Sequence, residues 1–441
     1  MVIVINLLIM MTLPLFPQQI GNFFNLMLFF YDINKNENKK MGYTIVQPSS
    51  AQPSYSADSQ TDLVFVLPGN ILTETLRISG DISFSAATIP CRGQNIMADL
   101  QNPRYLTPMI GAHALFSSFS VRRDGAQLEY ISNYGAYASQ IFGASESTRE
   151  VMSSSKSMTE LRGGNNVYIG GLAVVDSTGA NNIYNSKSFS IKPLICLTTV
   201  PVVDGNSGQI VIQCRLSPTN NFIVKSAASN SLAATYKNIY CSYETIDDKA
   251  MKSVREQIKD MPMTITTTQQ VAIRSNREFA SINIPIPGVT RGWLGSFLKV
   301  NTTADSPDLY DLPNLPGLQR VRLLVDGKDL TIKYPYNLAQ PNNLDQANYL
   351  ALTDPLLLID LAHETLINSG RIHKMSVSGV FGSRERQLYG NNGIIAQVFD
   401  PGLKMDNSST ISVEITSNAN GDGSTYFMNM SFISFVKNQL I

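Results

Sequence analysis

Three histidines are the residues of this chain best suited to hold a metal ion, and their spacing indicates whether they form a metal site. No two of His113, His363 and His373 have the HxH spacing of a histidine metal site. His363-Glu364 starts like the HExxH motif of zinc proteases, but Ile367 occupies the position of the second histidine. We therefore interpret His363 as a helix-packing residue and predict no metal site.

The four cysteines lie far apart in the chain and include no CxxC pair. Three of them fall in apolar runs typical of strands, where a free thiol behaves as a small hydrophobic residue. We predict buried, reduced thiols rather than disulfides or metal ligands, which fits a reducing compartment. The cysteines are Cys91, Cys196, Cys214 and Cys241.

Motifs for a nucleophile or a phosphate are missing from the sequence. It has no GxSxG elbow, Walker loop or GxGxxG fingerprint, and residues 163–171 (GGNNVYIGG) lack the lysine and the helix that phosphate binding requires. Arg122 and Arg123 beside Asp124 are better explained as an exposed strand end than as a phosphate site. No cofactor is predicted.

A catalytic pair of carboxylates has no recognisable sequence motif, because two acids about 5 to 10 Å apart in space can come from distant parts of a chain. Asp305, Asp308 and Asp311 are the candidates. Their segment, DSPDLYDLPNLPG, is rich in proline and precedes a strand, so we interpret it as a solvated loop. The sequence thus predicts no catalytic, cofactor-binding or metal-binding residue.

Length and charge limit the class of protein. A chain of 441 residues exceeds what one hydrophobic core usually serves, so two domains are expected. Charged residues make up 15%, against a typical share of about 25%, and such a neutral surface favours broad contacts with other subunits. The 34 basic residues balance 34 acidic ones, so no net charge attracts nucleic acid.

Residues 1–40 are apolar at first and then rich in Asn and Lys. A signal peptide is disfavoured because no Lys or Arg precedes Lys35, and a membrane span is disfavoured because Pro14 and Pro17 interrupt the apolar stretch. Two interpretations stay open. Either translation begins at Met41 and the preceding residues are a misannotated extension, or residues 1–55 include an arm that contacts a membrane.

Alternation of apolar and polar residues dominates the chain from Ser56 onward. This pattern, bounded by Gly, Pro, Asn and Asp clusters, predicts many short half-buried strands in a sandwich or barrel. Pro285 and Pro287 place their segment at a sheet edge. Trp293, the single tryptophan, lies in a strand-like run and is predicted to be buried in a core. The clearest apolar faces are Leu76, Ile78, Ile82 and Phe84; Ile210, Ile212, Cys214 and Leu216; Ile239, Cys241 and Tyr243; Ile282, Ile284 and Ile286; Ile411, Val413 and Ile415; and Tyr426, Met428, Met430 and Phe432.

Three segments are predicted to be helical. Residues 134–155 are rich in Ala and Ser, and residues 354–370 begin with Asp-Pro, end in Gly and are apolar on nearly all sides, as expected of a buried helix. Residues 248–261 place Met251 and Val254 on one face, together with Ile258. This last helix lies midway along the chain, where a linker between two domains belongs.

An internal similarity supports that division. Residues 120–134 (SVRRDGAQLEYISNY) and 323–336 (LLVDGKDLTIKYPY) each read as a strand, a tight Asp-Gly hairpin, a second strand and a helix. We interpret the two copies as a duplication, although Asp-Gly is common enough for two unrelated hairpins to share it. The predicted organisation is a first unit at 56–247, a linker helix at 248–261 and a second unit at 262–441.

Two successive all-β units, a helix between them and a helix after each matching hairpin resemble the double jelly-roll major capsid proteins of the tectivirus and adenovirus lineage. PRYLTPMIGAHALFSSFSVRRDGAQLEY and LPGLQRVRLLVDGKDLTIKYPYNLAQ are most similar to capsid sequences of polinton-like viruses and virophages. The resemblance covers residues 61–441. It implies an all-β fold of two tandem eight-stranded jelly-roll barrels with a few short inserted helices.

The same resemblance implies a function without enzymatic activity: a major capsid protein of a dsDNA virus that forms pseudo-hexagonal homotrimers tiling an icosahedral shell. The implied partners are further copies of the chain, neighbouring trimers, and penton and minor capsid proteins, with an internal membrane as a further candidate. Direct nucleic-acid binding is not expected. The implied location is the virion, after assembly inside the host cell.

Other functions compete with this interpretation. A minor or vertex coat protein would differ in its copy number in particles. A carbohydrate-binding β-sandwich, such as a receptor-recognising spike, would expose aromatic residues in a groove. A glycan-processing enzyme would depend on paired carboxylates.

Overall fold

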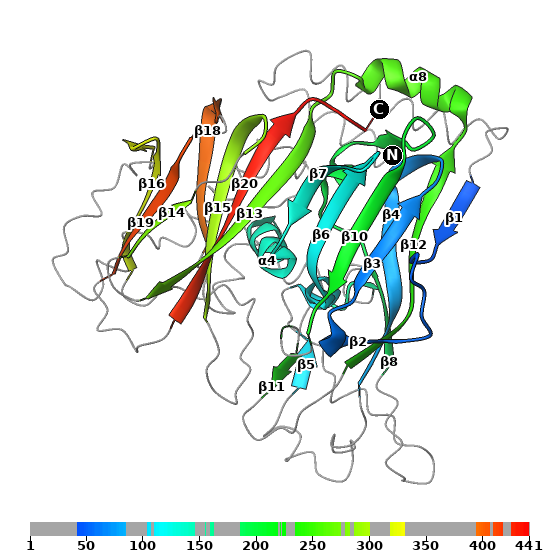
Figure 1. Ribbon diagram of the computed structural model, residues 1–441, viewed down its shortest axis with the longest axis horizontal. Helices are drawn as coiled ribbons and strands as arrows, with labels where there is room; N and C mark the ends of the chain where they lie inside the picture. The colour runs from blue at the N-terminus through cyan, green and yellow to red at the C-terminus, as the bar shows by residue number, and fades with distance from the viewer. Residues whose placement is uncertain are drawn as a thin grey trace, which may run out of the picture.

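A computed structural model of the chain shows two β-sandwiches side by side (Figure 1). The residues that it describes are 42–84, 104–106, 110–145, 155, 159–162, 186–218, 221, 223–225, 234–274, 278–282, 286–299, 318–330, 394–405, 409–417 and 425–440. Several predictions fall outside these residues. They concern the segment 1–40, Cys91, the loops at 163–171 and 305–311, and the helix at 354–370 with His363 and His373.

The first sandwich, here called the first roll, is built from two facing sheets. One follows the order β1-β12-β4-β8, and the other ends in β7-β6-β10-β3. All neighbours within these two paths are antiparallel. The eight strands are β1 (Gly42–Val46), β3 (Asp62–Leu67), β4 (Asn70–Phe84), β6 (Phe116–Arg123), β7 (Ala126–Ile131), β8 (Ser186–Ile191), β10 (Ile210–Leu216) and β12 (Ala234–Ile246).

The second sandwich, the second roll, repeats this strand order. Its sheets follow β13-β20-β15-β18 and β14-β19-β16-β17. In each roll, the first sheet therefore takes the first, eighth, third and sixth strands, and the other takes the second, seventh, fourth and fifth, which is the connectivity of a jelly roll. The eight strands are β13 (Met263–Arg274), β14 (Glu278–Ile282), β15 (Val289–Lys299), β16 (Leu318–Val325), β17 (Lys328–Asp329), β18 (Ile394–Lys404), β19 (Ile411–Ser417) and β20 (Thr425–Val436).

Short elements complete the described structure. They are β2 (Tyr55–Ser56), β5 (Arg104–Leu106), β9 (Val202–Asp204), β11 (Ile223–Lys225), the 3-10 helices η1 (Ala57–Ser59), η2 (Gly111–Leu115) and η4 (Cys196–Thr199), and the helices α4 (Tyr134–Ser145) and α8 (Asp248–Ile258). The strand β1 pairs with β12 and precedes residue 56, so the first roll begins earlier than the alternation pattern indicated. This strand has only five residues, none of them buried, so its alternation is too short to reveal it in the sequence.

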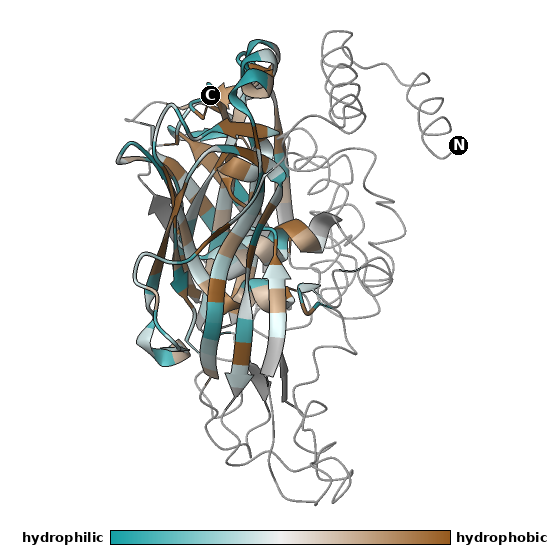
Figure 2. Cartoon of the chain, turned by 90° about the vertical axis from the view of Figure 1, so that its right-hand side faces the viewer, coloured by the Kyte–Doolittle hydropathy of each residue, from teal (hydrophilic) through white to brown (hydrophobic). Residues whose placement is uncertain are grey.

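The predicted apolar faces point into the sandwiches. Ile210, Ile212, Cys214 and Leu216 on β10 are fully buried, as are Ile411, Val413 and Ile415 on β19. Figure 2 shows the resulting bands of hydrophobic and hydrophilic residues along the strands. Side chains alternate between the two faces of a strand, so one apolar face per strand suffices to fill the space between two sheets.

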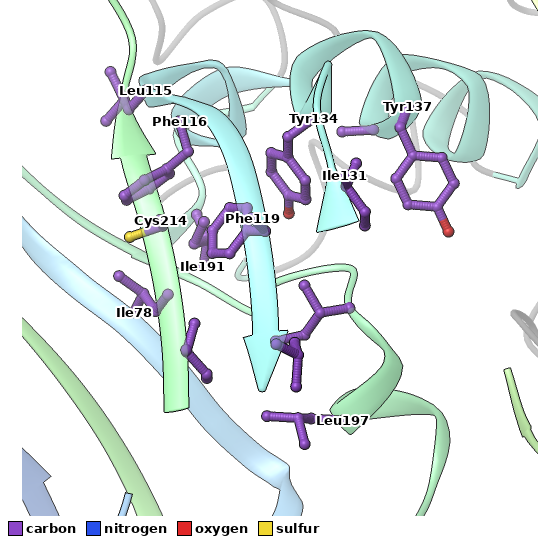
Figure 3. Packing of buried hydrophobic residues seen from close by; sticks show 14 of the residues in the cluster. Ile78, Leu115, Phe116, Phe119, Ile131, Tyr134, Tyr137, Ile191, Leu197 and Cys214 are labelled. Atoms are coloured by element: carbon purple, nitrogen blue, oxygen red, sulfur yellow. The ribbon is translucent and has the colours of Figure 1, made fainter. Parts of the chain in front are cut away.

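Aromatic rings fill the end of the first-roll core nearest α4. The rings of Phe116 and Phe119 lie 5.4 Å apart, and those of Phe119 and Tyr134 lie 4.4 Å apart (Figure 3). The prediction that Trp293 is buried is confirmed, since it is 2% exposed in the second-roll core.

The helix α8 connects the two rolls. Asp247 caps its first turn by accepting a hydrogen bond from the Ala250 backbone N–H at 2.6 Å. Met251, Val254 and Ile258 are all buried, which confirms the predicted apolar face. They pack with Leu72, Val202 and Ile246 from the end of the first roll.

The Asp-Gly hairpins are the same structure in both rolls. Asp124 and Asp326 have φ of 49° and 50°, and the following glycines have φ of 82° and 75°, as in a type I′ turn. The Asp124 backbone N–H donates to the Gln209 carbonyl, and the Asp124 carboxylate accepts from the Gln209 N–H at 2.8 Å. Asp326 makes both bonds with Thr410, the carboxylate bond at 2.7 Å. The shared bonding to the residue before the seventh strand favours duplication over two unrelated hairpins.

We predict that Asp124→Ala and Asp326→Ala each lower the free energy of unfolding by about 1 to 2 kcal/mol, because each loses one hydrogen bond and holds alanine in a left-handed conformation. Asp→Asn at the same positions is the matched control, because asparagine keeps a side-chain acceptor and tolerates positive φ. Urea unfolding midpoints measure the difference. Equal losses for Ala and Asn would contradict the role of the turn.

Candidate functional site

The described histidine lies in the protein core. The Nδ1 atom of His113 is 2.8 Å from the Tyr134 hydroxyl oxygen, which accepts a hydrogen bond from the Leu194 N–H at 3.1 Å. The Nε2 atom of His113 lies 3.6 Å from the Glu160 carboxylate. Burial raises the pKa of Tyr134 well above its ordinary value. These contacts tie α4 to η2 and to the segment before η4, and they give His113 a structural role.

The described residues contain no group of three or more His, Cys, Asp or Glu side chains able to hold a metal ion. Arg122 lines a shallow polar hollow on the outside of the first roll, whereas Arg123 donates hydrogen bonds to the Gln439 carbonyl and to Ser207. Neither arginine is placed as in a phosphate site. Within the same part of the chain, no helix is long and apolar enough to cross a membrane.

The joint between the rolls is the most elaborate polar arrangement that the structure describes. The strands β7 and β13 lie side by side in parallel, with Tyr130 opposite Thr267. Their contact joins four strands of the first roll to four strands of the second in one eight-stranded sheet. The Ser132 N–H donates to the Thr268 hydroxyl at 3.0 Å beside it.

The helix α4 fills the joint, and Figure 1 shows it between the two sandwiches. The amide of Gln140 donates to the Ser296 hydroxyl at 2.9 Å and to the Asn429 carbonyl at 3.1 Å, and accepts from the Ser431 hydroxyl at 2.6 Å. All four residues are at most 3% exposed. The buried apolar residues of the first roll also continue across the joint, to Leu294, Leu298, Ile394, Ala396 and Ile433 of the second.

A buried carboxylate bridges the two rolls. Glu129 lies on β7 and is 3% exposed, and its two oxygens accept the backbone N–H of Cys196 at 2.5 Å and of Thr266 at 2.7 Å. Cys196 begins η4 in the first roll, whereas Thr266 is on β13 in the second. The one sequence signal for this role is that Glu129 shares a strand face with Ile131, where an apolar residue is expected.

The C-terminal end of the second roll returns to the first. Leu440 is fully buried within the first-roll core, and its carbonyl accepts a hydrogen bond from the Asp204 N–H at 2.9 Å. The carboxylate of Asp204 lies 3.4 Å from Arg255 of α8. The chain therefore crosses between the rolls at α8 and again at its C-terminal residues, which restricts their relative movement.

Comparison with known protein families gives no match, and comparison with curated protein sequences gives none either. Solved structures do match. The Faustovirus major capsid protein gives a TM-score of 0.54 at 9% identity, over 90% of this chain and 90% of that chain. PBCV-1 VP54, as fitted into a cryo-EM reconstruction of the virophage Sputnik, gives 0.51 at 10% identity, over 91% of this chain and 94% of that chain. The chain has the double jelly-roll fold.

The double jelly roll confirms the predicted fold class. Polar side chains among its described residues satisfy backbone groups at the joint and at the hairpins. The large hydrophobic residues exposed on the described part of the chain are Tyr43, Ile45, Val66 and Tyr130.

We predict that Glu129→Gln lowers the free energy of unfolding by about 1 to 3 kcal/mol, because the amide nitrogen cannot accept one of the two buried N–H groups. The lost hydrogen bond weakens the contact between the two rolls. Calorimetry is therefore expected to resolve a separate unfolding transition for each roll in the variant. Glu74→Gln is the control, since Glu74 is 67% exposed and its ion pair with Lys192 contributes less than about 1 kcal/mol. Similar losses for both variants would contradict the bridging role.

Cys196, Cys214 and Cys241 are buried thiols, which confirms the thiol prediction for the described cysteines. Burial raises the pKa of Cys214 well above its ordinary value and that of Cys241 to about 12. Unfolded thiols ionise near pH 8.5. The contribution of these buried thiols to the free energy of unfolding is therefore complete below pH 8.5. It is lost as the pH rises towards 12, because the unfolded chain then binds fewer protons than the folded chain.

We expect a Cys91→Ser variant to react with a thiol reagent at pH 8 only after denaturation, because both accessibility and thiolate formation require unfolding. The absorbance of the thiolate that the reagent releases measures the reaction. The difference between wild-type protein and the variant gives the contribution of Cys91. Rapid labelling of the folded variant would show that these cysteines are accessible.

Proposed function

We propose that the protein is the major capsid protein of an icosahedral virus and that it assembles as a homotrimer. The observation that carries this proposal is the pairing of two jelly rolls of the same connectivity through one buried joint, in a fold shared with the Faustovirus major capsid protein over nine-tenths of both chains. Three chains supply six rolls. A ring of six similar units has a pseudo-hexagonal outline, which tiles a shell.

The physical properties of the fold suit a shell. Each roll pairs most of its strand edges within its own sheets, so neighbouring subunits do not add strands at random. Contacts between unlike surfaces close into a ring when the rotation between subunits is a fraction of a turn, and a closed ring does not grow into fibres. The low share of charged residues, 15%, favours extensive subunit contacts.

This proposal makes the protein a structural component of the virion rather than an enzyme. Its partners would be other copies of the chain, neighbouring trimers, and penton and minor capsid proteins. The balanced charge argues against direct packaging of the genome, which depends on many basic residues that neutralise phosphates. An internal membrane would be a further partner if the particle contains one.

We predict that the chain from Met41 to Ile441 sediments as a trimer at micromolar concentration, because the joint makes the two rolls one building unit and leaves the outer surfaces free for contact. Sedimentation velocity measures the mass. A stable monomer at all concentrations would contradict the proposal, and a low copy number in purified particles would favour a minor coat protein instead.

A further inference from the structure

The outer face of the first roll carries a polar hollow on the sheet β3-β10-β6-β7. Its volume is about 400 Å³, counting the part that is open to solvent, which is within the range of sites for small molecules. Ser118 and Ser120 on β6 lie in the middle of it, and longer side chains from β3, β7 and β10 surround them. Figure 1 shows these strands in the order β7-β6-β10-β3, leading away from the joint.

The register of the sheet explains why a hollow forms there. Ser120 lies between Gln213 on β10 and Tyr130 on β7 in one row across the strands. Ser118 lies beside Arg215 in the next row. Paired residues on one face of a sheet are about 4.5 to 5.5 Å apart, so two short serines between long side chains leave a depression.

The hollow has one positive charge in excess, since two guanidinium groups, Arg122 and Arg215, face one carboxylate, Asp62. Arg215 donates to both oxygens of Asp62, at 2.7 and 3.0 Å, and this hydrogen bonding lowers the pKa of Asp62. Arg122 is exposed and makes no ion pair with any described residue. One free guanidinium matches one carboxylate, which it can bind through two parallel N–H bonds. A phosphate dianion would need a second free cation.

Ser120 supplies an unused hydrogen-bonding group inside the hollow. This residue is 4% exposed, and its Oγ atom has no hydrogen-bond partner among the described residues. A buried hydroxyl without a partner is uncommon, because only a hydrogen bond offsets the cost of removing it from water. A polar atom of a bound ligand would satisfy it. Gln127, opposite Arg122 on β7, adds an amide that can both donate and accept.

Tyr130 forms the side of the hollow nearest the second roll. It is 49% exposed and lies opposite Thr267 of β13. A tyrosine ring offers a flat apolar surface with a hydroxyl at its end. The C–H face of a sugar ring packs on such a surface while the sugar hydroxyls meet polar side chains. An aromatic residue in a hollow is what a carbohydrate-binding β-sandwich is expected to expose.

We infer that the hollow binds an acidic sugar, with the sugar carboxylate on Arg122, the sugar ring on Tyr130 and a sugar hydroxyl bonded to Ser120. The inference goes beyond the proposed function and does not depend on it, because every contact comes from one chain. A uronic acid unit of a polysaccharide and a free sugar acid share this chemistry. A carboxylate on a protein partner lacks the sugar ring.

The first test compares small probes on the full chain by saturation-transfer NMR. Methyl glucuronide is expected to bind with a Kd on the order of 1 mM, as suits a shallow site. Methyl glucoside lacks the carboxylate and acetate lacks the ring, so each is expected to bind about tenfold more weakly or worse. A glucuronic acid tetrasaccharide separates the two sources: tighter binding than methyl glucuronide indicates a polysaccharide, and weaker binding indicates a free sugar acid.

The second test changes the hollow itself. Arg122→Gln removes the charge that pairs with the carboxylate, and Tyr130→Ala removes the ring, so each is expected to raise the Kd for methyl glucuronide about tenfold. Lys252→Gln is the matched control, because it removes an exposed positive charge from α8, and it is expected to bind as wild type does. Circular dichroism reports the fold, and the probes on wild-type protein decide the matter if a variant fails to fold.

The outcomes separate this inference from the proposed function. Binding of methyl glucuronide that Arg122→Gln and Tyr130→Ala both weaken supports the inference. No binding to wild-type protein, equal binding of methyl glucoside, or an equal loss in Lys252→Gln overturns it. Binding of N-acetylaspartate amide as tight as that of methyl glucuronide also overturns it and assigns the hollow to a protein partner. The mass of the assembled protein, which tests the proposed function, is independent of all these results.

Discussion

The fold depends on a carboxylate that is buried where two separate sandwiches meet. Glu129 belongs to the first roll, yet one of its oxygens accepts an N–H from the first roll and the other accepts an N–H from the second. Removing this carboxylate would leave the backbone N–H groups of Cys196 and Thr266 without their acceptor inside the joint, which costs more than an exposed ion pair contributes. Gln140 of α4 and Leu440 near the C-terminus strengthen the same connection. The rolls are therefore held together at several buried points, which suits the shell subunit proposed above.

The local elements could be predicted from the sequence because each depends on neighbouring residues. Alternation on β10 and β19 located buried strand faces, and three apolar residues on one helical face located α8. Asp-Gly at positions 124 and 326 located both hairpins, because few residue pairs adopt two positive φ angles in succession. The resemblance to double jelly-roll capsid proteins then supplied the order of these strands in space, which alternation alone does not determine.

The joint could not be predicted, because its contacts connect residues far apart in the chain. Glu129 and Thr266 are separated by 137 positions, and Gln140 and Ser431 by 291. Nothing in the segment around Leu440 marks it as a residue that fills the core of the other roll. The strand β1 was missed for another reason. It has only five residues and none of them is buried, so the alternation of Tyr43, Thr44 and Ile45 is too short to reveal a strand.

Cryo-electron microscopy of the assembled protein tests the central claim most directly, because it shows both the joint and the surroundings of each roll. The account predicts a threefold particle with six two-sheet densities in a ring, joined in pairs through the helix α4. A particle with a different symmetry, or one in which the two rolls of a chain are separated, would contradict it.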